Sequence, residues 1–490
     1  MKQEAYGNLV AGEFRTSSSG ELVQDVNPAD TREVLGDFSA MTREEVAQAV
    51  EAASEAFPGW KKTSAARRAP YLFAAANIVR EQAEQIARDI TREVGKTVKE
   101  ARVEVANAAN FFEYYAGFGR HPLGDNLPDE RPGVFTYTRR EPVGVIGLIT
   151  PWNDPLLTTA RKLAPALISG NTAVTKPAGD TPLATHHLAR VFKEAGLPAG
   201  VINTVVGSAS TIGDVLLEHP AMQAVSFTGS TGVGKELVRR AGERSELRMQ
   251  AEMGGKNASL VLGDADIDSA AETILAGAYT QGGQRCTATS RVVVTRDAHG
   301  PLLEALVARA EGIRVGNGLD EETGMGALIN QRQIDKALEA VEKGKADGAT
   351  VATGGSRLKG SEYDHGYFFP PTVIDDVAAD SWLAQEEIFG PVLSIITVRD
   401  LEEGVETVNN SAYGLSASIF TRSLAAAHHF ADNVEAGNVA VNLPTAGWGV
   451  HLPFGGFKDS GSPFKEQGHE ALQFYTRVRT VAMGVAQDQT

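Results

Sequence analysis

The sequence has a single cysteine, Cys286, among 490 residues. No disulfide can form within the chain, and the even, spaced set of cysteines typical of secreted proteins is missing. The amino-terminal stretch has no apolar core long enough for a signal peptide, and the longest apolar run, near Val143–Thr150, is far too short to span a membrane. We therefore expect a cytoplasmic protein without a membrane partner.

Basic residues are also scarce. Lys and Arg number 46 against 62 Asp and Glu, which gives a formal net charge of −16 and a pI near 5.2. A nucleic-acid partner is disfavoured because a phosphate backbone needs a basic footprint, although one local arginine can still bind a small anion. No cluster of cysteine and histidine has metal-ligand spacing, so no metal site is predicted.

The chain is too long for one ordinary hydrophobic core, so its 490 residues predict two or three domains. Its 42% hydrophobic and 22% charged residues are typical of a globular protein. The first part is predicted to be helical, with a capping box at Thr42 and Glu45 and a long helix over Ser64–Glu93. A strand-like run, Val134–Arg139, follows a loop rich in Pro and Gly.

From Val143 the chain alternates between strand and helix patterns with short Gly and Pro turns. Such alternation predicts an α/β fold with a parallel, doubly wound sheet. The expected strands lie at 143–150, 171–177, 201–207 and 224–230, and the expected helices at 156–168, 183–195 and from residue 231. Ligands of such sheets bind at the carboxyl ends of the strands, where Asn153, Lys176 and Gly229 fall.

A second α/β segment is expected after Gly255. Its strand candidates are residues 258–263, 290–296, 391–398 and 437–442. The tail, 471–483, also has the pattern of a strand. If it pairs with 134–139, the two form a small sheet that projects from the body. Exposed strands of that kind often serve oligomerisation.

Three polar residues are candidates for a catalytic role, and for each of them an ordinary structural role is the alternative. Cys286 lies in a polar, glycine-rich segment, QGGQRCTATSR, so a nucleophile and a small buried hydrophobe are about equally supported. Glu252, in QAEMGGK, is either a general base or a paired surface carboxylate. Asn153, in ITPWND, either donates to an oxyanion or caps a helix.

Two further segments suggest a phosphate-bearing ligand. The run FTGSTGVGK, 227–235, is a Gly-rich turn between a strand and a helix, and a helix N-terminus can hold a pyrophosphate. It matches neither GxGxxG nor the P-loop spacing, so alone it indicates only some phosphate ligand. Lys176 is either a surface lysine or a ligand of a cofactor's ribose or phosphate.

Seven motifs together are far more specific than any one of them, and along nearly the whole chain they resemble the aldehyde dehydrogenase superfamily. Their order and spacing match, with Glu252 34 positions and Asn153 133 positions before Cys286. The motifs are ITPWN, KPAxxTP, FTGSTxVG, EMGGK, GQRC, EEIFGPV and PFGGFKDSG. The resemblance implies a Rossmann-like NAD(P)-binding domain (1–120 and 142–253), an α/β catalytic domain (254–460) and a small β oligomerisation arm (121–141 and 461–490).

The resemblance also implies a role for each matching residue. Cys286 attacks the aldehyde, Asn153 and the Cys286 backbone N–H hold the oxyanion, hydride passes to NAD or NADP, and Glu252 activates the water that cleaves the thioester. Because members that transfer the acyl group to CoA typically lack this glutamate, its presence favours hydrolysis. The implied cofactor-binding residues are Thr150, Pro151, Trp152, Lys176, Gly179, Gly213, Phe227, Thr228, Gly229, Ser230, Val233, Met253, Glu387 and Phe389.

Departures from the family pattern bear on specificity. Many NAD-preferring members carry a glutamate where this chain has Gly179, and glycine leaves room for the 2′-phosphate of NADP, so NADP is expected to be accepted. The residues expected at the substrate are Asp154, Arg161, Arg285, Trp448 and Phe454. Arg161 suits an aldehyde that ends in a carboxylate. Alternatively Arg161 pairs with Asp154, and the ring-lined wall would then admit an aromatic aldehyde.

The segments NLPTAG, 442–447, and PFKEQG, 463–468, resemble the branch of the family that oxidises 2-oxoglutarate semialdehyde (2,5-dioxopentanoate). This is the favoured substrate, with water as acyl acceptor and a homodimer or homotetramer as the assembly. Two other functions compete. A cysteine esterase or thioesterase would need a histidine base, and only His451 lies in a converging motif. A non-catalytic scaffold is disfavoured because Cys286, Glu252 and Asn153 are all retained.

Overall fold

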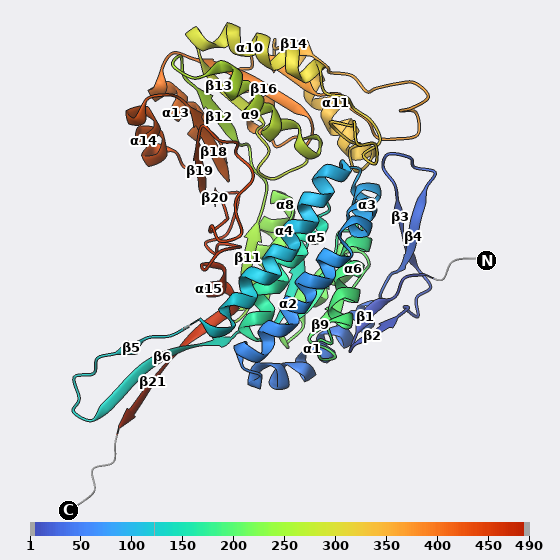
Figure 1. The fold of residues 1–490 in the computed structure, drawn as a ribbon, viewed down its shortest axis with the longest axis vertical. Helices are drawn as coiled ribbons and strands as arrows, with labels where there is room; N and C mark the ends of the chain where they lie inside the picture. The colour runs from blue at the N-terminus through green and yellow to red at the C-terminus, as the bar shows by residue number, and fades with distance from the viewer. Residues whose placement is uncertain (1–4, 122, 485–490) are drawn as a thin grey trace, which may run out of the picture.

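The computed structural model describes residues 5–121 and 123–484, and it places the two larger sheets one above the other in Figure 1. The chain opens with two antiparallel hairpins, which corrects the expectation that the first part is helical throughout. Strands of only three to six residues give too little alternation to be recognised. These strands are β1 (Asn8–Val10), β2 (Glu13–Arg15), β3 (Leu22–Val26) and β4 (Val34–Ser39).

Four helices follow, and the predicted capping box is confirmed, because Thr42 Oγ1 accepts from Glu45 N and the Glu45 carboxylate accepts from Thr42 N. The predicted single helix over 64–93 is broken at Gln82, whose φ and ψ of −98° and 11° begin a new helix. The helices are α1 (Arg43–Lys62), α2 (Ala65–Glu81), α3 (Ala83–Val94) and α4 (Val98–Gly117), and a 3₁₀ turn, η1 (Phe118–Arg120), ends this part.

The first large sheet is parallel and has the strand order β11-β10-β7-β8-β9, as the strand–helix alternation predicts. Its strands are β7 (Val145–Ile149), β8 (Thr172–Lys176), β9 (Ile202–Thr204), β10 (Met222–Thr228) and β11 (Arg248–Glu252). The connecting helices are α5 (Pro155–Ser169), α6 (Pro182–Glu194), α7 (Ala209–Glu218) and α8 (Thr231–Ala241). Nearly all of α5 is buried because it packs between this sheet and α4.

The second large sheet has the order β14-β15-β16-β13-β12-β18-β19 and is parallel apart from β14. Its strands are β12 (Ala258–Val261), β13 (Arg291–Thr295), β14 (Thr350–Thr353), β15 (Thr372–Asp375), β16 (Val392–Val398), β18 (Ser416–Phe420) and β19 (Asn438–Val441). The helices are α9 (Ile267–Tyr279), η2 (Thr280–Gly283), α10 (Arg296–Glu311), α11 (Gln331–Ala346), α12 (Trp382–Gln385), α13 (Leu401–Asn409) and α14 (Leu424–Asn433). A small pair, β17 (Tyr413–Gly414) and β20 (Phe457–Lys458), lies apart from it.

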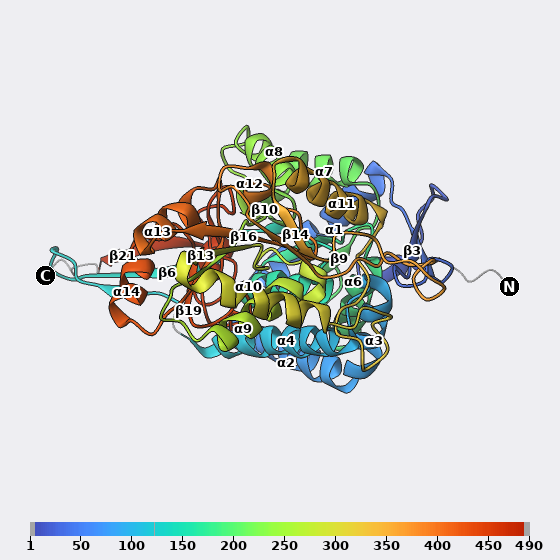
Figure 2. The same ribbon diagram turned by 90° about the horizontal axis from the view of Figure 1, so that it is seen from above.

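A three-stranded sheet projects from the body as an arm (Figure 1). β21 (Thr476–Gly484) pairs antiparallel along β6 (Val134–Pro142), and β5 (Asn126–Leu127) pairs with the other side of β6. The pairing of the tail with 134–139 is confirmed, except that the tail begins as a short helix, α15 (Ala471–Tyr475), whose apolar side chains are buried in the body. Seen from above in Figure 2, the arm and β3 lie at opposite ends of the molecule. Every helix in the described ranges is too short or too polar to cross a membrane.

Candidate active site

A cavity of about 820 Å³ lies at the carboxyl ends of the first sheet's strands and is closed by segments of the second sheet. Its walls include Asn153 after β7, Glu252 at the end of β11, and Cys286 after η2. Every residue predicted for the cofactor and the substrate lines it as well, with the exception of Gly213, which lies within α7. The fold therefore brings together residues as far apart in the chain as Thr150 and Phe454.

The segment that carries Cys286 is anchored by an asparagine that the sequence patterns did not single out. Asn257 donates its Nδ2 to the carbonyls of Cys286 and Ala288, both at 2.8 Å. A Cβ at Gly255 would lie 2.8 Å from the same Cys286 carbonyl. Gly255 therefore lets the chain that follows β11 pass close to the cysteine segment.

The Cys286 thiol sits among opposing charges. Burial raises its pKa to about 12, although Arg161 and Arg285 lower the pKa and favour the thiolate. Asp154 and Glu387 act in the opposite direction. Burial therefore favours the neutral thiol, whose proton must leave when the sulfur attacks.

Glu252 is a buried carboxyl group. Only 2% of the residue is exposed, and neither carboxylate oxygen has a hydrogen-bond partner in the part of the chain that the structure describes. Burial and the nearby Glu466 raise its pKa well above its ordinary value. A Cβ at Gly455 would lie 2.5 Å from Glu252 Oε1, so only glycine fits there. Such a carboxyl group, once deprotonated, is a strong general base.

Arg161 does not pair with Asp154, which corrects the alternative reading. Its Nη1 lies 3.1 Å from Oε2 of the fully buried Glu466, and Lys162 Nζ binds the other carboxylate oxygen. Asp154 instead binds Lys96. Each of the two side chains has a nearer partner of opposite charge, Glu466 for Arg161 and Lys96 for Asp154. The sequence patterns missed Glu466 and Lys162 because their contact joins segments far apart in the chain.

The arginine is held between two aromatic rings. Its guanidinium carbon lies 5.1 Å from the ring centre of Phe454 and 5.6 Å from that of Phe111. Such cation–π contacts hold the group in place without neutralising it. Trp448 completes this wall and donates its Nε1 to the carbonyl of Thr445. Further lining residues that the motifs did not indicate include Asn107 and Asn110. His451 and Gln467, which lie in quoted motif segments, line the cavity as well.

The other end of the cavity fits a nicotinamide dinucleotide. Ser230 begins α8 without a side-chain bond to the first turn, so the N–H groups of this turn can receive a pyrophosphate. Lys176, at the end of β8, is buried, which lowers its pKa to about 8. Gly179 lies three residues after Lys176, and a Cβ added to it would meet nothing within 4 Å.

Glu387 and Phe389 complete this end of the cavity from the second sheet's side. Glu387 accepts the backbone N–H of Gly255 at 2.9 Å, and burial raises its pKa to about 7. Phe389 has a φ of 58° and packs edge-on against Trp152, with ring centres 5.2 Å apart. The left-handed backbone turns this ring toward the cavity, an arrangement that costs energy and is typical of functional segments.

Comparison with known proteins decides the family. The model of the aldehyde dehydrogenase family matches residues 14–481. The chain belongs to the aldehyde dehydrogenase family. It is 42% identical to the alpha-ketoglutaric semialdehyde dehydrogenase of Bacillus subtilis, covering 98% of both chains, and 42% identical to the 2,5-dioxopentanoate dehydrogenase of Saccharolobus solfataricus, covering 95% of this chain and 97% of that one.

Solved structures agree with this assignment. The betaine aldehyde dehydrogenase of Staphylococcus aureus, solved in complex with NAD⁺, is 33% identical and superposes with a TM-score of 0.96 over 99% of this chain and 96% of that chain. The NAD-dependent aldehyde dehydrogenase of Sinorhizobium meliloti gives the same TM-score at 34% identity over the same shares. The chain is therefore an NAD(P)-dependent aldehyde dehydrogenase with the fold of that family.

Proposed function

We propose that this aldehyde dehydrogenase oxidises 2-oxoglutarate semialdehyde to 2-oxoglutarate, with NAD or NADP as hydride acceptor and water as acyl acceptor. The observation that carries the proposal is the position of Arg161 in the wall of the cavity that Cys286, Glu252 and Asn153 also line. The relatives from B. subtilis and S. solfataricus are named for this semialdehyde, and an aromatic aldehyde is not favoured by them.

The residues divide the reaction between them. As Cys286 attacks the aldehyde carbon, a C–S bond forms, the carbonyl π bond breaks and the thiol proton passes to water, while the Asn153 amide and the Cys286 backbone N–H donate to the resulting oxyanion. When bound, NAD(P) supplies the acceptor for the hydride that leaves this carbon. Glu252, in its deprotonated form, then takes a proton from the water that attacks the thioester. As the C–S bond breaks, this proton returns to the Cys286 sulfur and the carboxylic acid leaves.

The charges around Arg161 favour a substrate with a carboxylate. Arg161 and Lys162 share one anion, Glu466, so the cluster keeps one excess positive charge when Glu252 is protonated. Arg161 Nε has no acceptor in the described chain. A carboxylate at the far end of the aldehyde supplies the missing charge and a charge-assisted hydrogen bond.

The proposal is tested with initial rates of NAD(P)H formation from 2-oxoglutarate semialdehyde, succinate semialdehyde, benzaldehyde and propanal. We expect the semialdehydes to give the highest kcat/KM. Arg161→Leu should lower the ratio of kcat/KM for 2-oxoglutarate semialdehyde to that for propanal by about 10- to 100-fold, the value of one charge-assisted hydrogen bond. Taking the ratio cancels any effect on Cys286 that both aldehydes share.

Arg285→Leu is the matched comparison, because Arg285 also lines the cavity and also lowers the pKa of the Cys286 thiol. We expect it to leave the ratio between the two aldehydes closer to that of the wild type than Arg161→Leu does. A preference of the wild type for benzaldehyde, or an unchanged ratio in Arg161→Leu, would contradict the proposed substrate.

A further inference from the structure

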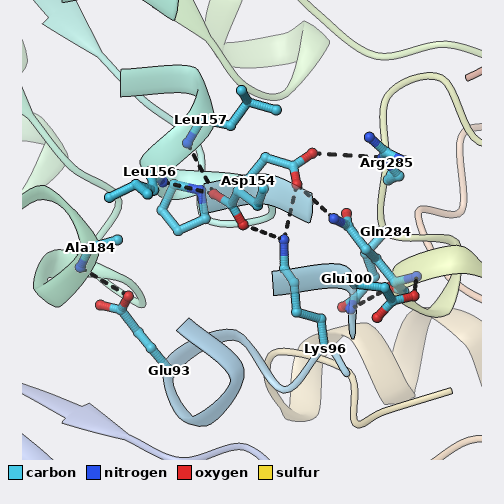
Figure 3. A network of polar contacts seen from close by, with 12 residues as sticks. Glu93, Lys96, Glu100, Asp154, Leu156, Leu157, Ala184, Gln284 and Arg285 are labelled. Atoms are coloured by element: carbon cyan, nitrogen blue, oxygen red, sulfur yellow. Dashed lines mark hydrogen bonds and ion pairs between the residues drawn. The ribbon is translucent and has the colours of Figure 1, made fainter. Parts of the chain in front are cut away.

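Figure 3 shows a network of buried charged groups, and two of its members, Asp154 and Arg285, line the cavity. The side chain of Lys96 is completely buried, and its Nζ donates to Glu104 Oε2 at 2.7 Å and to Asp154 Oδ1 at 2.9 Å. The other oxygen of Glu104 accepts the backbone N–H groups of Leu156 and Leu157, at 2.9 and 3.0 Å. Lys96 and Glu104 therefore fix the start of α5, and with it the loop that carries Asp154, to α4.

Asp154 also reaches across to the segment before the cysteine. Gln281 Nε2 donates to Asp154 Oδ1 at 2.6 Å, and Arg285 Nε lies 3.7 Å from Oδ2. The backbone N–H of Gln281 is held in turn by Glu100 Oε1 at 2.6 Å. Asp154 directly follows Asn153, and Arg285 directly precedes Cys286. One carboxylate thus touches both of the segments whose side chains meet the reacting carbonyl.

Because this network is ionic, we interpret it as fixing the positions of the groups that it joins rather than as stabilising the fold. Burial raises the pKa of Asp154, but Lys96 and Arg285 outweigh burial and hold the pKa at about 2. Buried ion pairs contribute little net stability compared with apolar side chains of similar volume, because desolvation offsets the attraction. Charge-assisted hydrogen bonds are, however, short and directional, so they fix the positions of the groups that they join.

We propose that Asp154 is a positioning residue, whose carboxylate sets the placement of the Asn153 amide relative to the Cys286 thiol. It is held by Lys96 on one side and holds segment 281–285 on the other. The inference rests on the proposed function in that Cys286 and Asn153 hold the reacting carbonyl, but it does not depend on which aldehyde is the substrate. A misplacement of about 1 Å can cost on the order of 10²-fold in rate.

The test is Asp154→Asn, which keeps the shape and one acceptor oxygen but removes the charge. Propanal serves as the substrate, because it has no carboxylate to interact with arginine. We expect the rate constant of the first turnover of NAD(P)H, measured by stopped flow, to fall about tenfold or more, while the KM for propanal changes by less than about twofold. A loss confined to kcat is the signature of an interaction that matters in the transition state.

Asp89→Asn is the matched control. Asp89 is a largely buried carboxylate bonded to His187 and to Gln85, both at 3.0 Å, and none of the three lines the cavity. We expect Asp89→Asn to shift the thermal midpoint without slowing the first turnover. The proposal is overturned when Asp154→Asn turns over within about twofold of the wild type, or when Asp89→Asn, at a similar shift of the thermal midpoint, slows the first turnover as much as Asp154→Asn does.

A double-mutant cycle adds a readout that a merely structural role would not give. If Asp154 acts through Gln281, then Asp154→Ala with Gln281→Ala loses no more first-turnover rate than Asp154→Ala alone. Additive losses would instead overturn a shared positioning role. A wild type that oxidises propanal but neither semialdehyde would contradict the proposed substrate and leave this test intact.

Discussion

Glu252 places an ionisable group where charge is poorly solvated, and this has a consequence for stability. The pKa of Glu252 is raised in the folded protein, so ionising this carboxyl group costs energy there. In the unfolded chain the same group ionises readily above about pH 4.5. The protonated Glu252 makes its full contribution to the free energy of unfolding at low pH. This contribution is lost as the pH rises through the pKa of Glu252 in the folded protein. Glu252→Gln should therefore melt at a higher temperature than the wild type near pH 8, with a smaller difference near pH 5.

Thermal unfolding of both proteins across this range, without cofactor, tests the prediction. A glutamine variant that is less stable than the wild type at every pH would show that the carboxylate has a partner in solution. The comparison also illustrates a general trade, because a group tuned for catalysis is often suboptimal for stability.

The same substitution separates the two halves of the reaction. Glutamine cannot accept a proton from water, so Glu252→Gln should give a first turnover of reduced cofactor at nearly the wild-type rate and then stall. A steady-state loss on the order of 10²- to 10⁴-fold is typical of a removed general base. Stopped-flow absorbance at the reduced-nicotinamide band measures both phases, and Cys286→Ala, which should show neither, is the control. Equal slowing of both phases would show that Glu252 does not act mainly in thioester hydrolysis.

At the scale of residues, local sequence predicts which groups meet but not how their charges pair. Cys286, Glu252 and Asn153 all line one cavity, because their motifs end elements of known geometry. The partner of Arg161 lies 305 positions away at Glu466, and no local pattern indicates such a contact. Lys96 was missed for the same reason.

At the scale of elements, the loop after β8 presents a test of cofactor choice. Gly179 is exposed and open, so a longer side chain fits without strain. Gly179→Glu should lower kcat/KM for NADP by about tenfold or more, since the carboxylate repels the 2′-phosphate, while kcat/KM for NAD is kept. Initial rates with both cofactors measure the ratio. Gly179→Gln has the same size without the charge, and an equal loss in this variant would assign the effect to bulk.

Elements with strong periodicity were predictable, and short or interrupted ones were not. The strands and helices from β7 onward follow from buried runs between Gly and Pro turns. The hairpins at 8–39 were missed because strands of three to six residues carry little pattern. The tail reads as one strand, yet its first turn, Ala471–Tyr475, is helical because it docks into the body, a tertiary effect that local preference does not contain.

At the scale of the whole molecule, the cavity forms only when the two large sheets come together. One sheet supplies Asn153 and Glu252, and the segments of the other supply Cys286 and Glu387. Sequence patterns predict each sheet separately, because they depend on neighbours in the chain. The relative placement of the sheets depends on contacts such as that of Asp154 with Gln281, 127 positions apart.

The arm is the feature of the whole molecule that indicates contact with a second chain. β21 is an edge strand that projects from the body, and it exposes Val478 and Met483 by 57% and 48%. Phe135 on the neighbouring β6 is 49% exposed. Exposed apolar residues on an edge strand favour pairing with another chain, so we predict a homodimer or homotetramer assembled through the arm.

Val478→Asp places a charge on this strand, and it should shift the mass measured by light scattering toward that of a smaller assembly. Val103→Asp is the control, because Val103 is 60% exposed but lies on α4, away from the arm, and we expect the mass to stay that of the wild type. Since Val478 does not line the cavity, the first turnover should persist in the smaller species. A monomeric wild type, or an unchanged mass in Val478→Asp, would show that the arm's apolar side chains serve another contact.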